Sequence, residues 1–247
     1  MKLSVMAGGL FIASSLFANA HSIHWGYTGA EGPEFWGDLD PKYSMCKKGH
    51  SQSPINIVKK DILKTDGLEP IKFNYHTSAN EIINNGHTIQ VNIKPGSSIT
   101  IDNKSFELKQ FHFHSPSENT IDGKFFPLEA HFVHIAKDGS IAVVAVLFEN
   151  GKENPYIKKI WEKMPKEEAK EKFELSAQTI NKLLPKDKKY YRFSGSLTTP
   201  PCSEGVRWFV LRKHPEVSMK EVMEFTHTLN YPNNRPTQPL NARKVLQ

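Results

Sequence analysis

The chain has 247 residues and a formal net charge of +6, with 38% hydrophobic and 23% charged residues. This length suits one large domain or two small ones, and these fractions are ordinary for a soluble globular protein. Much of the basic excess lies between Lys152 and Lys189, where lysines alternate with glutamates. Mixed signs at this density are typical of a solvated helical face and argue against a nucleic-acid-binding stripe. The basic balance is compatible with loose association with an anionic cell surface.

The N-terminus has the pattern of a secretory signal. Lys2 precedes an apolar run that extends to Phe17, and Ala18-Asn19-Ala20 follows as an A-x-A cleavage site. The run is shorter than the roughly 20 apolar residues that span a bilayer, which disfavours a membrane anchor. We therefore expect residues 1–20 to be a cleaved signal peptide. The mature chain, residues 21–247, is expected to be exported to the periplasm or the cell surface, without a transmembrane segment.

The expected export determines how the two cysteines, Cys46 and Cys202, are interpreted. Disulfides persist outside the cytosol, so an even pair of cysteines in an exported chain predicts a bridge. The loop that this bridge closes is long, and the chain-entropy argument gives roughly 4–5 kcal/mol of stabilisation as an upper value. Two inert buried thiols are the alternative. A zinc role is disfavoured, because neither cysteine has a Cys-x-x-Cys partner or a neighbouring histidine.

Short strands separated by turn residues account for most of the chain. Asn84-Asn85-Gly86 punctuates alternating runs such as 88–93, and the continuous apolar run 141–148 is suited to a buried central strand. Helical signals are few, and they comprise a cap at Ser176, a stop at Pro185 and a capping box of Ser218 with Glu221. No internal repeat, low-complexity tract or linker indicates a second domain. The pattern predicts a single β-rich α+β domain.

Two alternating runs in the middle of the chain carry the clearest chemical signal. The first, residues 106–114, predicts a strand with phenylalanines facing an apolar layer. Its other face is expected to carry Leu108, Gln110, His112 and His114. The second run, residues 128–135, is expected to carry on one face Glu129, His131 and Val133. His134 lies on the opposite face and is expected to be a hydrogen-bonded core histidine. If the two strands pair as antiparallel neighbours, three imidazoles converge on one point.

Three neutral imidazole nitrogens with an open fourth position suit a catalytic zinc ion. His112, His114 and His131 are therefore candidate Zn2+ ligands. Imidazole also suits copper, iron or nickel, but a tetrahedral three-nitrogen set without thiolate or carboxylate favours zinc. Gln110 and Glu129 each precede a candidate ligand by two residues on the same face. We therefore expect each to form a hydrogen bond with the imidazole nitrogen that does not bind the metal. Taken alone, the His-x-His pair is more typical of polar positions on a half-solvated strand than of a metal site.

Further motifs extend this pattern across nearly the whole mature chain. In chain order they are His24-Trp-Gly-Tyr27, Gln52-Ser-Pro-Ile-Asn-Ile57, Asn84-Asn-Gly-His87, Gln110-Phe-His-Phe-His114, Glu129-Ala-His131-Phe-Val-His134, Ser196-Leu-Thr-Thr-Pro-Pro201 and Arg235-Pro-Thr-Gln-Pro-Leu240. They resemble the motifs of the α-class carbonic anhydrases, in the order of that family.

The resemblance implies a fold and an activity. The fold is one domain, residues 21–247, with a large, twisted and mainly antiparallel central sheet and short surrounding helices. The activity is that of a zinc lyase that interconverts CO2 and bicarbonate and is inhibited by anions and sulfonamides. Extracellular members of the family often carry a disulfide at this place, which supports the pairing of Cys46 with Cys202.

The resemblance also implies roles at individual positions. Thr198 is similar to the family's threonine that orients the nucleophile, and Glu118 to the buried carboxylate beside it. An ionised carboxylate can only accept hydrogen bonds, so Thr198 must donate to Glu118 and accept from the nucleophile. His87 is similar to the proton shuttle, although a histidine after a glycine is otherwise typical of an exposed turn. The residues implied for the substrate pocket and its support are Thr199, Val133, Val143, Leu197, Val206, Trp208 and Tyr27.

Two other functions stay open at this point. A carbonic-anhydrase-like domain used only for binding would keep the fold, but such relatives typically lose a zinc histidine, and this chain has His112, His114 and His131. A zinc esterase is the rival among enzymes, because zinc-activated water can attack activated esters. The narrow apolar pocket predicts esterase action as a weak side activity. The sequence carries no signal for the oligomeric state.

Overall fold

The structure is a computed structural model, and it describes residues 24–247. The predicted signal peptide, residues 1–20, lies outside the described residues. Within residues 24–247, each helix is too short or too polar to cross a bilayer.

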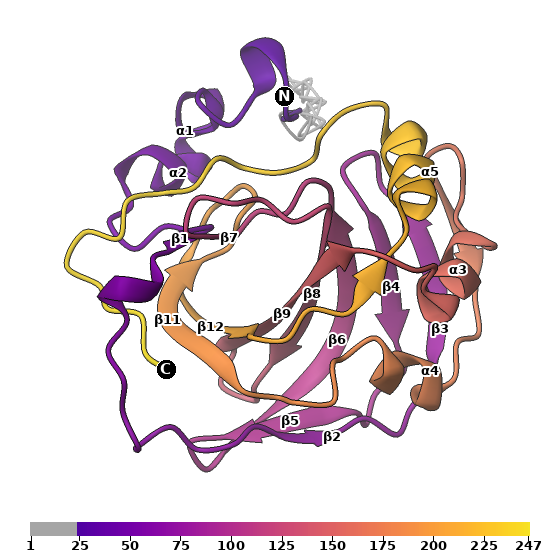
Figure 1. The fold of residues 1–247 in the computed structure, drawn as a ribbon. Coiled ribbons are helices and arrows are strands. Elements are labelled where there is room, and N and C mark those ends of the chain that lie inside the picture. The colour runs from indigo at the N-terminus through magenta and orange to yellow at the C-terminus, as the bar shows by residue number, and fades with distance from the viewer. Residues whose placement is uncertain (1–23) are drawn as a thin grey trace, which may run out of the picture.

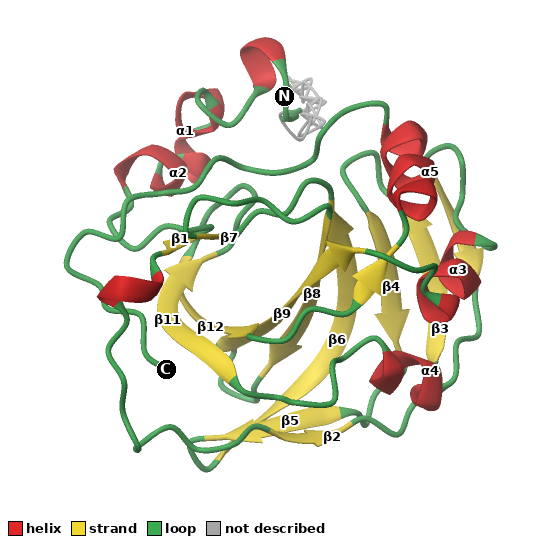
Figure 2. Ribbon diagram, viewed as in Figure 1, coloured by secondary structure: helices red, strands yellow, loops and turns green. Residues whose placement is uncertain are grey.

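One mixed sheet of 11 strands dominates the described chain (Figures 1 and 2). Its strands are β2 (Lys72–Asn74), β3 (Ala79–Asn84), β4 (Ile89–Ile93), β5 (Ser98–Ile101), β6 (Lys104–His114), β8 (Leu128–Ile135), β9 (Ile141–Asn150), β10 (Ala169–Lys172), β11 (Tyr190–Ser196), β12 (Glu204–Leu211) and β13 (Glu216–Val217). The main path runs β10-β3-β4-β6-β8-β9-β12-β11, with β5 beside β6, β2 beside β5 and β13 beside β9. A separate two-stranded sheet pairs β1 (Asn56–Ile57) with β7 (Thr120–Ile121).

The predicted fold class is confirmed. Neighbouring strands of the large sheet are antiparallel except where β9 meets β12 and β13, which run parallel to it. The apolar run 141–148 lies in β9, between β8 and β12, as expected for a central strand buried on both faces.

The helices are short and lie around the sheet (Figure 2). They are α1 (Trp36–Leu39), α2 (Met45–Lys48), α3 (Pro155–Trp161), α4 (Ala177–Lys182) and α5 (Met219–Leu229). The sequence signals for the last two are confirmed. The Ser176 hydroxyl accepts from the N–H of Thr179 at the start of α4, and Ser218 with Glu221 forms the capping box of α5.

Side-chain alternation gives the sheet two apolar faces. Phe111, Phe113 and Phe132 belong to the larger cluster, which α3, α4 and α5 complete with residues such as Trp161 and Phe225. The smaller cluster lies on the opposite face and includes Val143, Val206, Trp208 and Val210. Residues that alternate with the phenylalanines of β6 and β8 therefore face the smaller cluster.

One expected position on β6 was wrong. Leu108 does not share a face with Gln110 and the histidines, but packs in the larger cluster with Phe111 and Phe113. The cause is a shift in the β6–β8 register between Leu108 and Gln110. The extra residue of a bulge reverses the alternation beyond it, so both halves of β6 bury their apolar residues on one face.

The Lys/Glu-rich stretch is exposed as expected, but it is only partly helical. Between α3 and α4, residues 169–172 form β10, an exposed edge strand that pairs with β3. Alternating Lys and Glu on an edge strand keep it soluble and oppose pairing with a second sheet edge. For residues 169–172 the prediction of a solvated helical face was therefore wrong, because this charge pattern lies on an exposed strand.

The predicted disulfide between Cys46 and Cys202 is confirmed, and it bridges 156 positions of sequence. It attaches α2, in the N-terminal part of the chain, to the loop that leads into β12. Trp36 and the bridged cysteines form a small apolar cluster of their own, with Trp25 and Tyr27 packed against it.

Candidate metal centre

The pairing of β6 with β8 assembles three histidines on one face of the sheet. His112 lies directly opposite His131, and His114 follows two residues along β6. One donor nitrogen from each ring lies within 4.8 Å of the other two. The antiparallel pairing expected from the sequence is thus confirmed, and it brings the three candidate ligands together.

In each of the three rings, the nitrogen that points away from the other two rings, here called the outer nitrogen, forms a hydrogen bond with an oxygen atom of the protein. The contacts are 2.8 Å from His112 Nδ1 to Gln110 Oε1, 2.9 Å from His131 Nε2 to Glu129 Oε1, and 2.7 Å from His114 Nδ1 to Asn233 O. Because the acceptors are a carbonyl, a carboxylate and an amide oxygen, the outer nitrogens donate and the inner nitrogens keep free lone pairs. The inner set is His112 Nε2, His114 Nε2 and His131 Nδ1.

The environment keeps the three rings neutral. Burial lowers the pKa of His112, His114 and His131, and neighbouring imidazoles lower the pKa of His112 and His131 further. The Nε2 atom of His114 is buried and has no hydrogen-bond partner. Neutral imidazoles with converging lone pairs are suited to bind a transition-metal cation.

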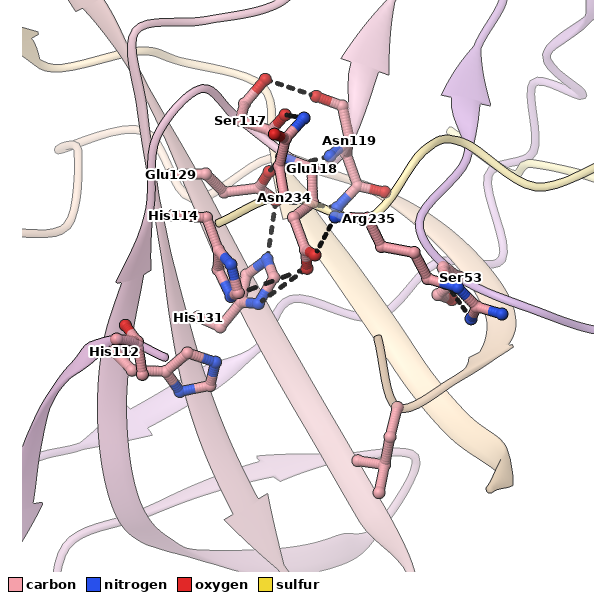
Figure 3. A network of polar contacts seen from close by, with 12 residues as sticks. Ser53, His112, His114, Ser117, Glu118, Asn119, Glu129, His131, Asn234 and Arg235 are labelled. Atoms are coloured by element: carbon pink, nitrogen blue, oxygen red, sulfur yellow. Dashed lines mark hydrogen bonds and ion pairs between the residues drawn. The ribbon is translucent and has the colours of Figure 1, made fainter. Parts of the chain in front are cut away.

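Glu129 connects the ligand His131 to the Glu118 segment. Its Oε2 atom accepts from the main-chain N–H groups of Glu118 and Asn119 at 2.7 and 2.8 Å, and Oε1 accepts from the Asn119 side chain at 2.7 Å. The carboxylate that orients a candidate ligand therefore also fixes the main chain of Glu118 (Figure 3).

Glu118 points toward the rings of His114 and His131 (Figure 3). Its Oε2 lies 3.6 Å from His114 Nε2 and 3.9 Å from His131 Nδ1, while its Oε1 accepts from the main-chain N–H of Arg235 at 2.9 Å. Burial raises the pKa of Glu118 to about 8, against the lowering effects of the Arg235 N–H and the Thr198 hydroxyl. A bound cation would favour the ionised form, because opposite charge lowers the pKa of a carboxyl group.

Thr198 is buried in the loop between β11 and β12. The loop is closed by hydrogen bonds from Leu197 N to Ser203 O and from Cys202 N to Thr199 O, of 3.0 and 2.8 Å. Cys202 also carries the disulfide. The disulfide and these bonds therefore fix the main chain around Thr198.

The expected pocket residues lie together beside the histidines. Val143, Val206 and Trp208 belong to the smaller apolar cluster, and Val133 and Leu197 pack against it. The Trp208 ring stands edge-on to the His131 ring, with centroids 4.9 Å apart. The metal centre thus has an apolar wall on one side.

His87 lies farther out, at a cavity of about 500 Å³ whose lining includes Tyr27, Glu168 and Tyr231 but none of the three candidate ligands. Its ring stacks on Trp25 with centroids 3.8 Å apart. Burial and His24 lower the pKa of His87, while Glu168 acts to raise it. The imidazole is therefore neutral at neutral pH and able to accept a proton. Burial raises the pKa of Tyr27, and the nearby Glu118 carboxylate raises it further.

The sequence reading missed the contribution of the C-terminal segment. The Asn233 carbonyl completes the set of outer partners, and the Arg235 N–H holds Glu118. The Arg235 guanidinium is buried and donates to Gln52 Oε1, Ser53 O and Cys46 O. Main-chain donors and acceptors carry no residue-type signal, so only the neighbouring Arg235 motif marks this segment in the sequence.

Comparison with known proteins agrees with this geometry. The family model for eukaryotic-type carbonic anhydrase matches residues 31–247. The chain belongs to the eukaryotic-type (α) carbonic anhydrase family. A carbonic anhydrase of Pectobacterium carotovorum is 44% identical over 246 residues, which cover 100% of this chain and 98% of the relative. The α-carbonic anhydrase of Thermovibrio ammonificans, solved in complex with the inhibitor sulfanilamide, superposes with a TM-score of 0.88 at 50% identity, covering 91% of this chain and 99% of that one.

The same fold also occurs under another name. The crystal structure of dioscorin complexed with ascorbate superposes with a TM-score of 0.85 at 34% identity, covering 90% of this chain and 97% of that one. The sheet alone therefore does not decide between catalysis and binding, and the decision rests on the side chains of the site.

The first prediction concerns metal binding. Replacing His131 with Ala removes one of three donors, so zinc affinity should fall by more than the roughly 10–100-fold typical of losing an outer hydrogen-bond partner. Equilibrium dialysis with metal analysis measures this. His134→Ala is the matched control, because His134 is buried on the other face and bonds to the Tyr75 hydroxyl and Ala142 O. Equal zinc affinity in His131→Ala and the parent protein would contradict the assignment.

Proposed function

We propose that the chain is a zinc enzyme that interconverts CO2 and bicarbonate, with His112, His114 and His131 as the Zn2+ ligands. The observation that carries this proposal is the convergence of three neutral imidazoles, two buried and that of His112 half-buried, next to an apolar wall. Three nitrogen donors leave the full charge of the metal in place, whereas a thiolate or carboxylate ligand would reduce it. In carbonic anhydrases, bound zinc is known to lower the pKa of its water to about 7, which supplies a nucleophile at neutral pH.

The protein orients that nucleophile through Thr198 and Glu118. Glu118 in its ionised form accepts a hydrogen bond from the Thr198 hydroxyl. The Thr198 oxygen is then left to accept a hydrogen bond from the nucleophile. The Arg235 N–H and the main chain held by Glu129 keep Glu118 in place. Thr198 is fixed by its closed loop, so both partners are positioned before substrate enters.

The apolar wall suits a small substrate without hydrogen-bonding groups. Val133, Val143, Leu197, Val206 and Trp208 offer CO2 a surface from which water is excluded. Thr199, which follows Thr198 in the loop between β11 and β12, is proposed as a further substrate-binding residue. A narrow pocket beside this wall would leave little room for a bulky ester, so esterase activity is expected to be weak. Anions and sulfonamides are proposed as inhibitors at the same site.

His87 is proposed to carry the proton that hydration releases. Its lowered pKa keeps the ring neutral near pH 7, and its cavity opens toward solvent-exposed residues such as His24 and Glu31. A neutral imidazole accepts a proton and passes it to buffer. Tyr27, whose ring centroid lies 6.4 Å from that of His87 and which interacts electrostatically with the buried Glu118, is proposed to support this route.

The place of action is proposed to be outside the cytoplasm. The support comes from the Cys46–Cys202 disulfide, since such bridges persist in oxidising compartments, together with the signal pattern of residues 1–20. The basic excess would allow loose contact with an anionic surface.

The test of the proposed function is stopped-flow CO2 hydration before and after zinc chelation. Hydration should fall to the uncatalysed rate when zinc is removed and return when zinc is added back. A binding-only domain would show no hydration in either state. Comparing kcat/KM for CO2 with that for an activated ester then ranks the two activities, and a preference for the ester would overturn the assignment of CO2 as the substrate.

Glu118→Gln should retain zinc but lose about 100-fold in kcat/KM, in the range seen for loss of one positioned hydrogen-bonding group in an active site. An amide donates as well as accepts, so Thr198 is no longer forced into one orientation. Zinc content and CO2 turnover are the two measurements. Glu174→Gln, at an exposed carboxylate, is the matched control. Full turnover by Glu118→Gln would show that Glu118 does not orient Thr198.

His87→Ala should lower kcat in weak buffer by up to roughly 100-fold, the lower end of the range for a positioned proton-transfer group. The value of kcat/KM should stay unchanged, because CO2 attack precedes proton release. Added imidazole should restore kcat by accepting the proton in place of the side chain. A parallel fall in kcat/KM would assign His87 to substrate attack or to structure, and unchanged kcat would make it a turn residue only.

A further inference from the structure

The segment that follows α5 runs past both the His87 turn and the metal centre. The helix ends at Asn230, whose φ of 63° is in the left-handed region, and residues 231–235 then leave it. Figure 1 shows this part of the chain, in yellow, crossing above the sheet from α5 toward α1 and α2. The segment therefore lies where it can contact the turn and the strand of His114 together.

Asn233 makes those contacts with one fully buried side chain. Its Nδ2 donates to His87 O at 3.0 Å and to Phe113 O at 2.9 Å, and its Oδ1 accepts from Ser115 N at 2.8 Å. Its own carbonyl accepts from His114 Nδ1. One residue thus joins the main chain at His87 to the main chain on both sides of a proposed zinc ligand.

Tyr231 adds a second attachment one residue earlier on the turn. Its hydroxyl donates to Gly86 O, and its ring lies 6.0 Å from the ring of Tyr27. Gly86 and His87 are consecutive, so the two side chains of the segment bind consecutive carbonyls of the turn. Gly86 has a φ of +79°, a conformation that requires glycine and brings the turn close to Glu168.

The turn itself leaves these two carbonyls available. The N–H of Gly86 bonds to Asn84 Oδ1, and the N–H groups of His87 and Thr88 bond to Asn85 Oδ1. Those bonds shape the turn but do not attach it to the sheet. The Tyr231 bond attaches the turn at Gly86 to the segment after α5, and Asn233 joins His87 to Phe113 of β6.

We propose that Tyr231 and Asn233 are positioning residues for proton transfer, which fix the main chain of Gly86 and His87 relative to the strand of His114. This inference rests on the proposed shuttle role of His87. Transfer through intervening water depends on the separation between the donor and the imidazole, so a loose turn slows the proton step while leaving CO2 attack intact.

The test uses Tyr231→Phe, which removes one hydroxyl, in the full zinc-loaded enzyme. We expect kcat in weak buffer to fall about two- to tenfold, as for the loss of one hydrogen bond. The value of kcat/KM should not change, and imidazole should restore kcat. Tyr190→Phe is the matched control, since it also removes a hydroxyl bonded to a main-chain oxygen, Glu69 O at 2.5 Å. That variant should keep the parent kcat.

Asn233→Ala extends the test because it removes both donations and the Ser115 contact but keeps the carbonyl that accepts from His114. It should lower kcat more than Tyr231→Phe while retaining zinc. If Asn233→Ala does not fold, Tyr231→Phe alone decides the matter. Unchanged kcat in Tyr231→Phe, or equal falls in kcat and kcat/KM, overturns the inference.

The shuttle proposal and the positioning proposal fail in different ways. If His87→Ala lowers kcat and Tyr231→Phe does not, only the positioning role is wrong. If His87→Ala leaves kcat in weak buffer unchanged, the shuttle is wrong and the positioning role is overturned with it.

Discussion

The register between β6 and β8 is the constraint on which the site depends. It sets His112 opposite His131, and a slip of one residue would turn His131 to the helix-covered face and place Ala130 or Phe132 opposite His112. Burial of Phe111 and Phe132, which are also paired in this register and stack on each other, opposes such a slip. The hydrophobic alternation that stabilises the sheet therefore also determines which histidines meet. Packing energy and ligand geometry are two consequences of one pairing.

Burying the polar groups of the site imposes a second requirement, because each buried donor or acceptor needs a partner. The outer nitrogens of the imidazoles obtain theirs from Gln110, Glu129 and Asn233, and the same burial that makes these bonds necessary also lowers the pKa of the rings. Desolvation thus produces neutral rings, and the hydrogen bonds select the tautomer. Both effects leave the inner lone pairs for a cation.

Alternation and residue type were enough to predict the three histidines, two of their outer partners, the disulfide and the central strand, since each is a local pattern or a pairing of rare residues. The bulge that places Leu108 in the larger cluster was missed, although the apolar residues change phase from Phe106 and Leu108 to Phe111 and Phe113. The third outer partner is the main-chain oxygen of Asn233, which any residue could supply. The edge strand β10 was predicted to be a helical face. Alternating charges indicate exposure to solvent, which a strand and a helix can share, so they do not distinguish the two elements.

The site is built from segments that are distant in sequence. The N-terminal part contributes Cys46 and Gln52, which Arg235 binds together, and Arg235 in turn holds Glu118 through its own N–H. The disulfide connects the same N-terminal region to the loop of Thr198. The orientations of Glu118 and Thr198 therefore both depend on contacts between segments near the two ends of the described chain. Since dioscorin shares the fold at a TM-score of 0.85, the fold by itself does not determine function, which depends on the side chains of the site.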